Sequence, residues 1–264
     1  MQVIILAGGF GSRLGNLTTD IPKPMVKVGK YPILLHIINH FYSFGFREFI
    51  ICLGYKQEVI KEYFMKLKFF SNNLLISKET AEIIQPLKED LFPEAEFKLI
   101  DTGLQSNTAQ RLINVKSQIN NEGPFFLTYG DGISSVDLRD LVSFHNSHKG
   151  IATVTSVHPS ARFGEIISEK DGLVNYFKEK PAVQKSWING GYFIFEKEVF
   201  DYLDIEKNEM LEQAPLERLV KNEKLYTYKF EGYWRCMDTP RDLKLITDEL
   251  ESEKYLYALK DGSK

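Results

Sequence analysis

Residues 2–14, QVIILAGGFGSRL, place a run of apolar residues directly before a turn that contains three glycines. The run at residues 2–6 is short and β-branched, so it predicts a buried strand. Because glycine has no Cβ and tolerates a positive φ, Gly8, Gly9 and Gly11 let backbone N–H groups approach phosphate oxygens closely. The stretch predicts a strand followed by a phosphate-binding loop, although such glycines can also form no more than a tight turn.

The loop matches neither of the two common phosphate-binding patterns. A P-loop ends in Gly-Lys-Ser or Gly-Lys-Thr, and a dinucleotide-binding loop beginning at Gly9 and Gly11 would need a third glycine where Leu14 stands. The chain instead supplies two cations, Arg13 and Lys23, and Lys23 lies between two prolines that restrict the backbone. Two cations beside several N–H donors suit a triphosphate.

Beyond the loop, short β-branched runs alternate with helical patterns, which is typical of strand–helix–strand units in a mostly parallel sheet. Further strands are expected at residues 47–53, 97–103 and 125–132, and helices at residues 31–45, 56–64 and 107–119. Residues 66–93 show no clear period and predict an inserted hairpin or a long excursion. Short strands at residues 164–168, 173–177 and 188–195 predict an antiparallel or mixed extension, which a C-terminal helix follows.

No repeat, low-complexity tract or linker interrupts the sequence, so we expect one α/β domain over residues 1–264. Residues 1–150 are expected to form a nucleotide-binding half. Residues 151–264 are expected to carry the second half of the site and the C-terminal helix.

Composition excludes several classes of protein. With 264 residues and 43% hydrophobic content the chain can bury a sizeable core. A formal charge of -3 gives no global basic field for a nucleic acid or an anionic membrane. No apolar run reaches the roughly 18 residues of a membrane span, and the N-terminus lacks a signal-peptide pattern. The two cysteines, Cys52 and Cys236, fit neither a disulfide framework nor a zinc spacing, so we expect a cytoplasmic protein.

A series of motifs in one order resembles the sugar-phosphate nucleotidyltransferases. LAGGFGSRL and PKPMV are followed by YGDG at residues 129–132, RFGEI at 162–166, EKP at 179–181, INGGYFIF at 188–195 and YWRCMDTPRD at 233–242. The resemblance spans nearly the whole chain and implies a Rossmann-like α/β fold with a mixed, mostly parallel sheet and a small antiparallel extension.

Within that family the chain is most similar to the glucose-1-phosphate cytidylyltransferase branch, through PKPMV, DTG, LTYGDG and MDTPRD. The resemblance implies that CTP and glucose 1-phosphate give CDP-glucose and pyrophosphate, and that the protein is a homo-oligomer. It also implies Mg²⁺ as cofactor, held by Asp131 and Asp238. From the residues alone, Asp131 is more often a turn former and Asp238 more often a helix cap.

The resemblance also assigns roles to residues at the matching positions. Arg13, Lys23, Asp131 and Lys180 are the implied catalytic residues, and Lys180 holds the sugar phosphate. The implied nucleotide-binding residues are Leu6, Ala7, Gly8, Gly9, Gly11, Ser12, Arg13, Lys23, Ser106, Arg111 and Gly130. The implied sugar-binding residues are Gly164, Glu179, Lys180, Asn189 and Gly190. The five histidines fit no catalytic or metal spacing and are expected to be structural or surface residues.

One motif departs from the branch. Residues 108–112 read TAQRL where the cytidylyltransferase pattern resembles TGGRL, so Ala109 and Gln110 replace two glycines. The acceptor is therefore open, because Gln110 could read a polar group that a glucose-specific enzyme ignores. Two rival functions also stay open, namely a nucleotidyltransferase for UTP, dTTP or GTP, and a catalytically silent subunit that senses a ligand.

Overall fold

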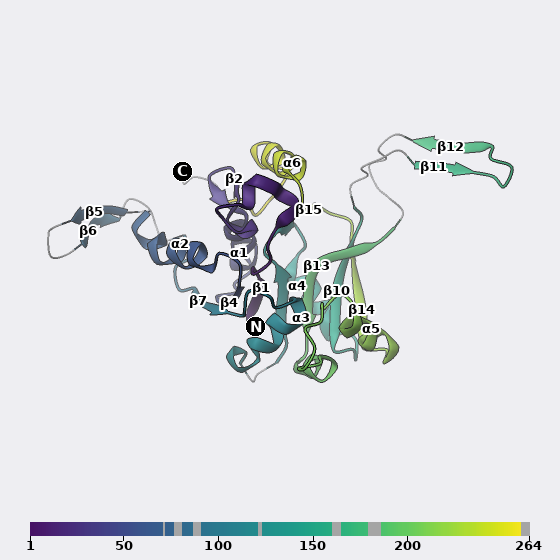
Figure 1. Ribbon diagram of the computed structural model, residues 1–264, viewed down its shortest axis with the longest axis horizontal. Coiled ribbons are helices and arrows are strands. Elements are labelled where there is room, and N and C mark those ends of the chain that lie inside the picture. Colours follow the sequence, from purple (N-terminus) through teal and green to yellow (C-terminus); the bar gives the residue numbers. More distant parts are fainter. Residues whose placement is uncertain are drawn as a thin grey trace.

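The computed structural model describes residues 1–70, 72–76, 81–86, 91–120, 123–159, 165–178 and 186–259. Figure 1 shows a central sheet with helices packed around it and two hairpins at opposite ends. The helices are α1 (Ile33–Ser43), α2 (Gln57–Phe70), α3 (Thr108–Asn114), α4 (Leu138–Asn146), α5 (Ala214–Lys221) and α6 (Pro240–Glu251). The helices expected at residues 31–45, 56–64 and 107–119 are confirmed as α1, α2 and α3.

The central sheet has seven strands in the order β14-β10-β13-β8-β1-β4-β7. Their bounds are β1 Val3–Leu6, β4 Glu48–Leu53, β7 Glu96–Asp101, β8 Phe125–Tyr129, β10 Ala152–Val157, β13 Ile188–Phe195 and β14 Leu225–Phe230. Only β13 runs antiparallel to its neighbours β8 and β10, while the other neighbouring pairs in the sheet are parallel. The expected Rossmann-like fold with a mixed, mostly parallel sheet is confirmed. INGGYFIF, however, is a central strand and not part of the extension.

The first strand is apolar throughout because both of its faces are covered. Val3 and Ile5 face one side of the sheet and pack in a cluster with side chains of α1 and α6. Ile4 and Leu6 face the other side and pack with Leu112 of α3 and with α5. Full burial of one such side chain stabilises the fold by about 1.5–3 kcal/mol.

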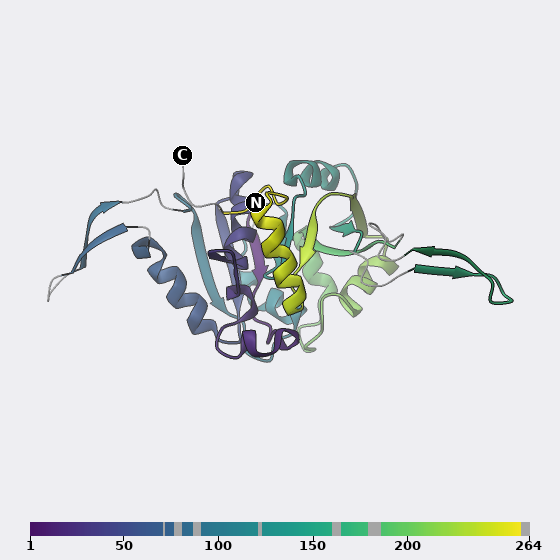
Figure 2. The same ribbon diagram turned by 90° about the horizontal axis from the view of Figure 1, so that it is seen from above.

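Two hairpins extend the fold beyond the central sheet, as Figures 1 and 2 show. Strands β5 (Asn72–Ile76) and β6 (Ala81–Pro86) pair antiparallel, which confirms the hairpin expected within residues 66–93. Strands β11 (Glu165–Ser168) and β12 (Val174–Lys178) form the second hairpin and confirm the small antiparallel extension.

A pair of short strands joins residues that lie about a hundred positions apart in the chain. Strand β9 (Gly132–Ser134) pairs antiparallel with β15 (Trp234–Cys236), and Gly132 lies opposite Cys236. The Met237 N–H also donates to the Asp131 carbonyl at 2.9 Å. Helix α6, which contacts β15 and β2 (Lys27–Val28), begins just beyond this pairing and lies next to the N-terminal segment in Figures 1 and 2. The residues before β9 and after β15 are therefore brought side by side.

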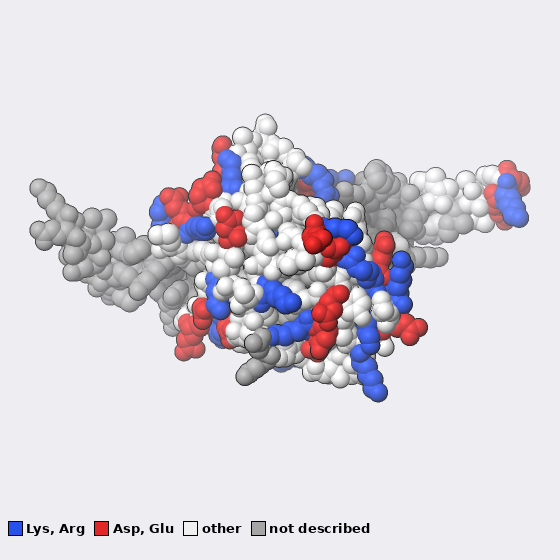
Figure 3. All heavy atoms as spheres, turned by 60° about the horizontal axis from the view of Figure 1, so that its bottom comes forward, with Lys and Arg blue, Asp and Glu red and all other residues white. Residues whose placement is uncertain are grey.

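Charged side chains of both signs are interspersed on the face drawn in Figure 3. That face presents no extended field of one sign. Among the described residues, no helix combines the length and apolar character that a membrane crossing requires.

Buried histidines hold the C-terminal segment against α1. His36 Nε2 lies 3.0 Å from the Val28 carbonyl, and the Leu259 N–H donates to His36 Nδ1 at 3.0 Å. His40 Nε2 lies 2.8 Å from the Val136 carbonyl. These contacts confirm structural roles for both residues. Burial lowers the pKa of His36 and lowers that of His40 to about 3, so both rings are neutral in the folded protein.

We predict that the protein loses stability as the pH falls from about 7.5 to about 5.5. In the unfolded chain, histidines with a pKa of about 6.5 become protonated over this range. In the folded protein, the pKa values of His36, His40 and His145 are lowered, so proton uptake favours the unfolded state. Urea unfolding at both pH values measures the loss. The loss should be smaller in His40→Gln than in the wild type. Equal free energies of unfolding at the two pH values in the wild type would contradict this prediction.

Candidate active site

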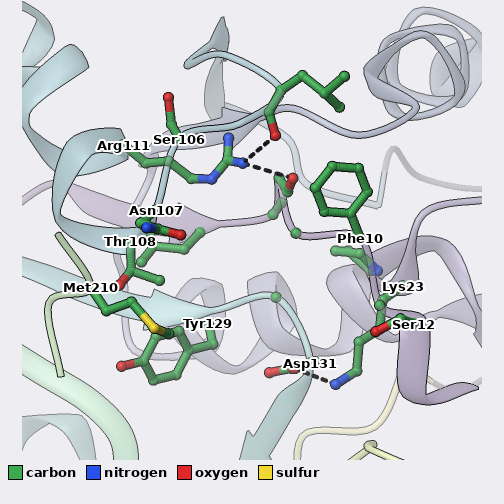
Figure 4. Close-up of a pocket in the computed structure, with 18 of the residues that line it drawn as sticks. Phe10, Ser12, Lys23, Ser106, Asn107, Thr108, Arg111, Tyr129, Asp131 and Met210 are labelled. Atoms are coloured by element: carbon green, nitrogen blue, oxygen red, sulfur yellow. Dashed lines mark hydrogen bonds and ion pairs between the residues drawn. The ribbon is translucent and has the colours of Figure 1, made fainter. Parts of the chain in front are cut away.

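A cavity of about 460 Å³ opens at the carboxyl ends of the parallel strands β1 and β8, where ligands bind in open α/β sheets. Figure 4 shows how its side chains converge from separate parts of the chain. Every predicted nucleotide-binding residue lines it, as does Asp131. The remaining lining residues are Phe10, Pro24, Leu104, Gln105, Asn107, Thr108, Tyr129 and Met210. The roles of the predicted residues in binding stay predictions.

The phosphate loop turns sharply at Gly11. Gly11 has φ 65°, a left-handed conformation that favours glycine, and it precedes a short 3₁₀ segment at Ser12–Thr18. A Cβ at Gly11 would also lie 2.8 Å from the Cβ of Lys23. The turn therefore lets the loop pack directly against the segment that carries the second predicted cation.

Arg111 ties the loop to the ends of two neighbouring strands. Its buried guanidinium donates to the carbonyls of Leu53 at 2.9 Å and Gly103 at 2.9 Å, and to the Thr102 hydroxyl at 2.8 Å. Its Nη2 donates to the Gly8 carbonyl at 2.8 Å. The sequence resemblance implied that Arg111 is a nucleotide-binding residue. In this structure the guanidinium donates mainly to backbone carbonyls of the same chain, and the residue also lines the cavity.

Lys23 joins the two aspartates predicted to hold a metal. Its Nζ lies 2.6 Å from Asp131 Oδ2 and 2.7 Å from Asp238 Oδ1. Arg13 Nη1 contacts the other Asp238 oxygen at 2.9 Å, from a side chain that is 74% exposed. The structure thus brings together four predicted residues from three distant segments of the chain.

The ammonium of Lys23 is held in its charged form. Burial is the largest influence on its pKa and lowers it, but the charge of Asp131 and hydrogen bonds to both aspartates outweigh burial. The net effect raises the pKa of Lys23. Lys23 is therefore a fixed cation at the edge of the cavity.

Asp238 is not the cap of α6. Thr239 occupies the cap position, its hydroxyl accepts from the Asp242 N–H at 3.2 Å, and the Asp242 carboxylate accepts from the Thr239 N–H at 2.8 Å. This capping box provides acceptors for N–H groups at the start of the helix. The Asp238 carboxylate instead accepts hydrogen bonds from Lys23 and Arg13.

The donor set at this point fits a hard divalent ion. One ligand atom each from Asp131, Cys236 and Asp238 lie within 4.8 Å of one another. Burial, followed by the charges of Asp131 and Asp238, raises the pKa of the Cys236 thiol, which is therefore neutral. The two carboxylates are the charged oxygen ligands that Mg²⁺ and Mn²⁺ prefer. Sequence reasoning missed Cys236, because only the β9–β15 pairing places it beside Asp131.

The sugar-binding predictions are only partly described. Asn189 and Gly190 lie on β13, and the Gly190 carbonyl accepts from the Trp234 indole at 2.7 Å. Neither belongs to the lining of the cavity among the described residues. The predicted residues Gly164, Glu179 and Lys180 lie outside the described residues.

Tyr129 connects the two halves of the site. Its hydroxyl donates to Glu212, which also accepts from the Thr108 hydroxyl at 2.7 Å. The Tyr129 side chain also interacts with that of Asn189. Burial and then the charge of Glu212 raise the pKa of Tyr129, so it stays a neutral donor.

Exposed apolar side chains that sequence reasoning missed also line the cavity. Phe10 is 46% exposed, Leu104 49% and Met210 42%. Phe10 packs against Tyr55, with ring centroids 5.3 Å apart. The available signal was Phe10 itself, a large apolar residue between the glycines of the loop.

Ala109 and Gln110, which replace the two glycines of the cytidylyltransferase pattern, do not belong to the lining of the cavity. Ala109 is buried in the core beneath the sheet, and Gln110 Nε2 donates to Asn114 Oδ1 at 2.9 Å. Asn114 in turn donates to the Thr102 carbonyl at 3.0 Å. Gln110 therefore supports the turn that Arg111 also holds.

The mixed sheet and the paired aspartates beside two cations form a site whose charges suit phosphate groups and a divalent ion. The chain belongs to the nucleotidyl transferase family, whose sequence pattern matches residues 2–253. The predicted resemblance is thereby confirmed.

Two relatives and one solved structure resemble the chain over most of its length. The probable glucose-1-phosphate cytidylyltransferase of Bacillus subtilis is 39% identical, over 92% of this chain and 93% of that protein. The glucose-1-phosphate cytidylyltransferase of Salmonella typhimurium is 38% identical over the same shares of each. A putative glucose-1-phosphate thymidylyltransferase from Bacillus anthracis, solved with a sucrose, has a TM-score of 0.66 at 21% identity, with 100% of this chain and 98% of that chain covered. This structure shares the fold.

We predict that Gly8→Ala destabilises the protein, because the new Cβ would lie 2.2 Å from Arg111 Nη1. The expected loss is about 1–3 kcal/mol in the free energy of unfolding, measured by urea denaturation. Gly54→Ala should act alike, since its Cβ would lie 2.6 Å from the same atom. Gly9→Ala is the matched control, as its Cβ would meet nothing within 4 Å. Equal stability of the Gly8 and Gly9 variants would show that Arg111 does not constrain the loop.

Proposed function

We propose that the protein transfers a cytidylyl group from CTP to glucose 1-phosphate and releases CDP-glucose and pyrophosphate. The observation that carries the proposal is the bridge of Lys23 to Asp131 and Asp238 at the edge of a cavity that all the predicted nucleotide-binding residues line. The relatives named glucose-1-phosphate cytidylyltransferase, at 38–39% identity over 92% of the chain, support the choice of substrates.

The reaction brings two anions together. An oxygen of the sugar phosphate forms a bond to the α-phosphorus of CTP. The bond from that phosphorus to the oxygen that bridges the α- and β-phosphorus atoms breaks, and pyrophosphate leaves with the electron pair. Charge neutralisation and positioning are therefore the main tasks of the protein. Arg13 and Lys23 neutralise the triphosphate and the charge that builds on the leaving pyrophosphate.

A divalent ion fits the remaining task. Asp131 and Asp238 would hold Mg²⁺, which supplies further neutralisation of the phosphate oxygens. Lys180, with Glu179 beside it, is proposed to bind the sugar phosphate and hydroxyls, together with Gly164, Asn189 and Gly190. The two free cysteines suit the reducing cytoplasm in which we place the enzyme.

Specificity for CTP and glucose 1-phosphate is supported by the place of the TAQRL departure. The Gln110 amide donates to Asn114 on its own helix. Its side chain is therefore used within the helix and is not expected to change which sugar phosphate binds. The rival of a silent sensing subunit is disfavoured, because a sensor does not need the ion pairs among Arg13, Lys23, Asp131 and Asp238.

Pyrophosphate release from CTP, UTP, dTTP and GTP, each crossed with glucose 1-phosphate and other sugar phosphates, tests this function. We expect turnover only for CTP with glucose 1-phosphate, and no turnover in excess chelator. Asp131→Asn should lower turnover by about a hundredfold or more, whereas Asp171→Asn, a carboxylate at the tip of the β11–β12 hairpin, should not. Preference for another triphosphate, or full activity in chelator, would refute the proposal.

We further propose that the protein assembles as a homo-oligomer through the β11–β12 hairpin. Ile166 and Phe177 lie opposite each other on this hairpin and are 61% and 63% exposed. A lone two-stranded hairpin is marginal in water, so these side chains suit a face that a second copy covers.

Light scattering at micromolar concentrations tests the assembly. We expect a multiple of the monomer mass for the wild type and a shift toward monomer in Phe177→Glu. Ile205→Glu is the control, because Ile205 is 73% exposed and belongs to the segment between β13 and α5, not to the hairpin. A monomeric wild type would end this proposal.

A further inference from the structure

The Lys23 ammonium occupies the space between the two carboxylates. Its distances of 2.6 Å to Asp131 and 2.7 Å to Asp238 are those of close, charge-assisted hydrogen bonds. The two aspartates come from the end of β8 and from the turn before α6, so no local turn holds them together. Lys23 is one of the contacts that fixes their separation.

The same two carboxylates are the donors that a divalent ion would use. A metal such as Mg²⁺ held by both carboxylates would need their oxygens at about 2.0–2.1 Å, and it would then use oxygens that the ammonium now occupies. An ammonium and a divalent ion repel each other strongly at such range. Lys23 and the ion therefore compete for Asp131 and Asp238.

Both carboxylates already have cationic partners. Lys23 contacts both of them, and Arg13 contacts the second oxygen of Asp238. Carboxylates that are paired with cations attract a divalent ion more weakly than unpaired carboxylates do. A triphosphate changes this pairing, because its oxygens offer Lys23 a new partner.

Only the side chain of Lys23 needs to move. Its backbone lies in a short 3₁₀ segment between Pro22 and Pro24, where the Met25 N–H donates to the Pro22 carbonyl at 2.8 Å. Lys23 lines the cavity as well as contacting the aspartates, so its ammonium lies at the boundary between the two.

We propose that Lys23 holds the metal position between Asp131 and Asp238 in the nucleotide-free protein, and that the divalent ion enters only when nucleotide phosphates take up the Lys23 ammonium. The inference rests on the proposed function in that it takes these aspartates as the metal ligands. Metal and nucleotide then bind interdependently, each strengthening the other.

Binding of Mn²⁺ alone, measured by the electron paramagnetic resonance signal of free Mn²⁺, tests the inference without any turnover. The wild type should bind Mn²⁺ weakly in the absence of nucleotide. Lys23→Met should bind it about tenfold or more tightly, since two carboxylates lose a competing charge. Lys23→Arg, which keeps the cation, should bind as weakly as the wild type.

Two controls place the effect at this site. Lys66→Met removes one cation from a surface pair with Glu62 and should leave Mn²⁺ binding unchanged. Adding Asp238→Asn to Lys23→Met should abolish the gain. A Lys23→Met variant that is folded by circular dichroism and binds Mn²⁺ no more tightly than the wild type would overturn the inference.

A measurement on the wild type covers the case in which Lys23→Met does not fold. The ¹⁵N NMR signal of the Lys23 ammonium should be unaffected by Mg²⁺ alone and should shift when a non-hydrolysable CTP analogue is added with it. A shift caused by Mg²⁺ alone would overturn the inference. Neither readout needs catalysis, so the two claims fail separately. If Mn²⁺ binding and the Lys23 signal behave as expected but CTP and glucose 1-phosphate are not turned over, only the proposed function is refuted. If turnover is found but Mn²⁺ binding or the Lys23 signal does not behave as expected, only the exchange by Lys23 is refuted.

Discussion

The bridge of the Lys23 ammonium to Asp131 and Asp238 is the interaction on which the rest of the site depends. It joins three segments separated by 108 and 215 positions in the chain, and it sets the spacing of two carboxylates that would repel each other without a cation between them. A cluster of this kind holds its geometry only if the backbone on every side is fixed. The fold supplies that rigidity in two ways.

The first is the parallel arrangement of β1, β4, β7 and β8, which gathers their carboxyl ends at one edge of the sheet. Arg111 ties three of those ends together through the carbonyls of Gly8, Leu53 and Gly103. The second is the β9–β15 pairing, which delivers the turn before α6 to the end of β8. The capping box of α6 then satisfies the helix start and leaves Asp238 available.

Much of this arrangement follows from the sequence, because its signals are local. The apolar run at residues 2–6 and the glycines after it predict a buried strand and a loop, and both are present. Contacts between distant segments were out of reach. Period and composition do not show that INGGYFIF enters the central sheet as its antiparallel strand, that Cys236 lies beside the aspartates, or that Gln110 bonds Asn114. Arg111 was predicted to line the site, but its hold on the backbone depends on three strand ends that only the folded sheet brings together.

Anomalous diffraction from crystals grown with Mn²⁺ and a non-hydrolysable CTP analogue tests the central claim most directly, because it locates the metal and the Lys23 ammonium together. The account predicts one Mn²⁺ bound to carboxylate oxygens of Asp131 and Asp238, with Lys23 Nζ on a phosphate oxygen of the analogue. A metal bound elsewhere, or a Lys23 still bridging both aspartates with the nucleotide in place, would contradict it.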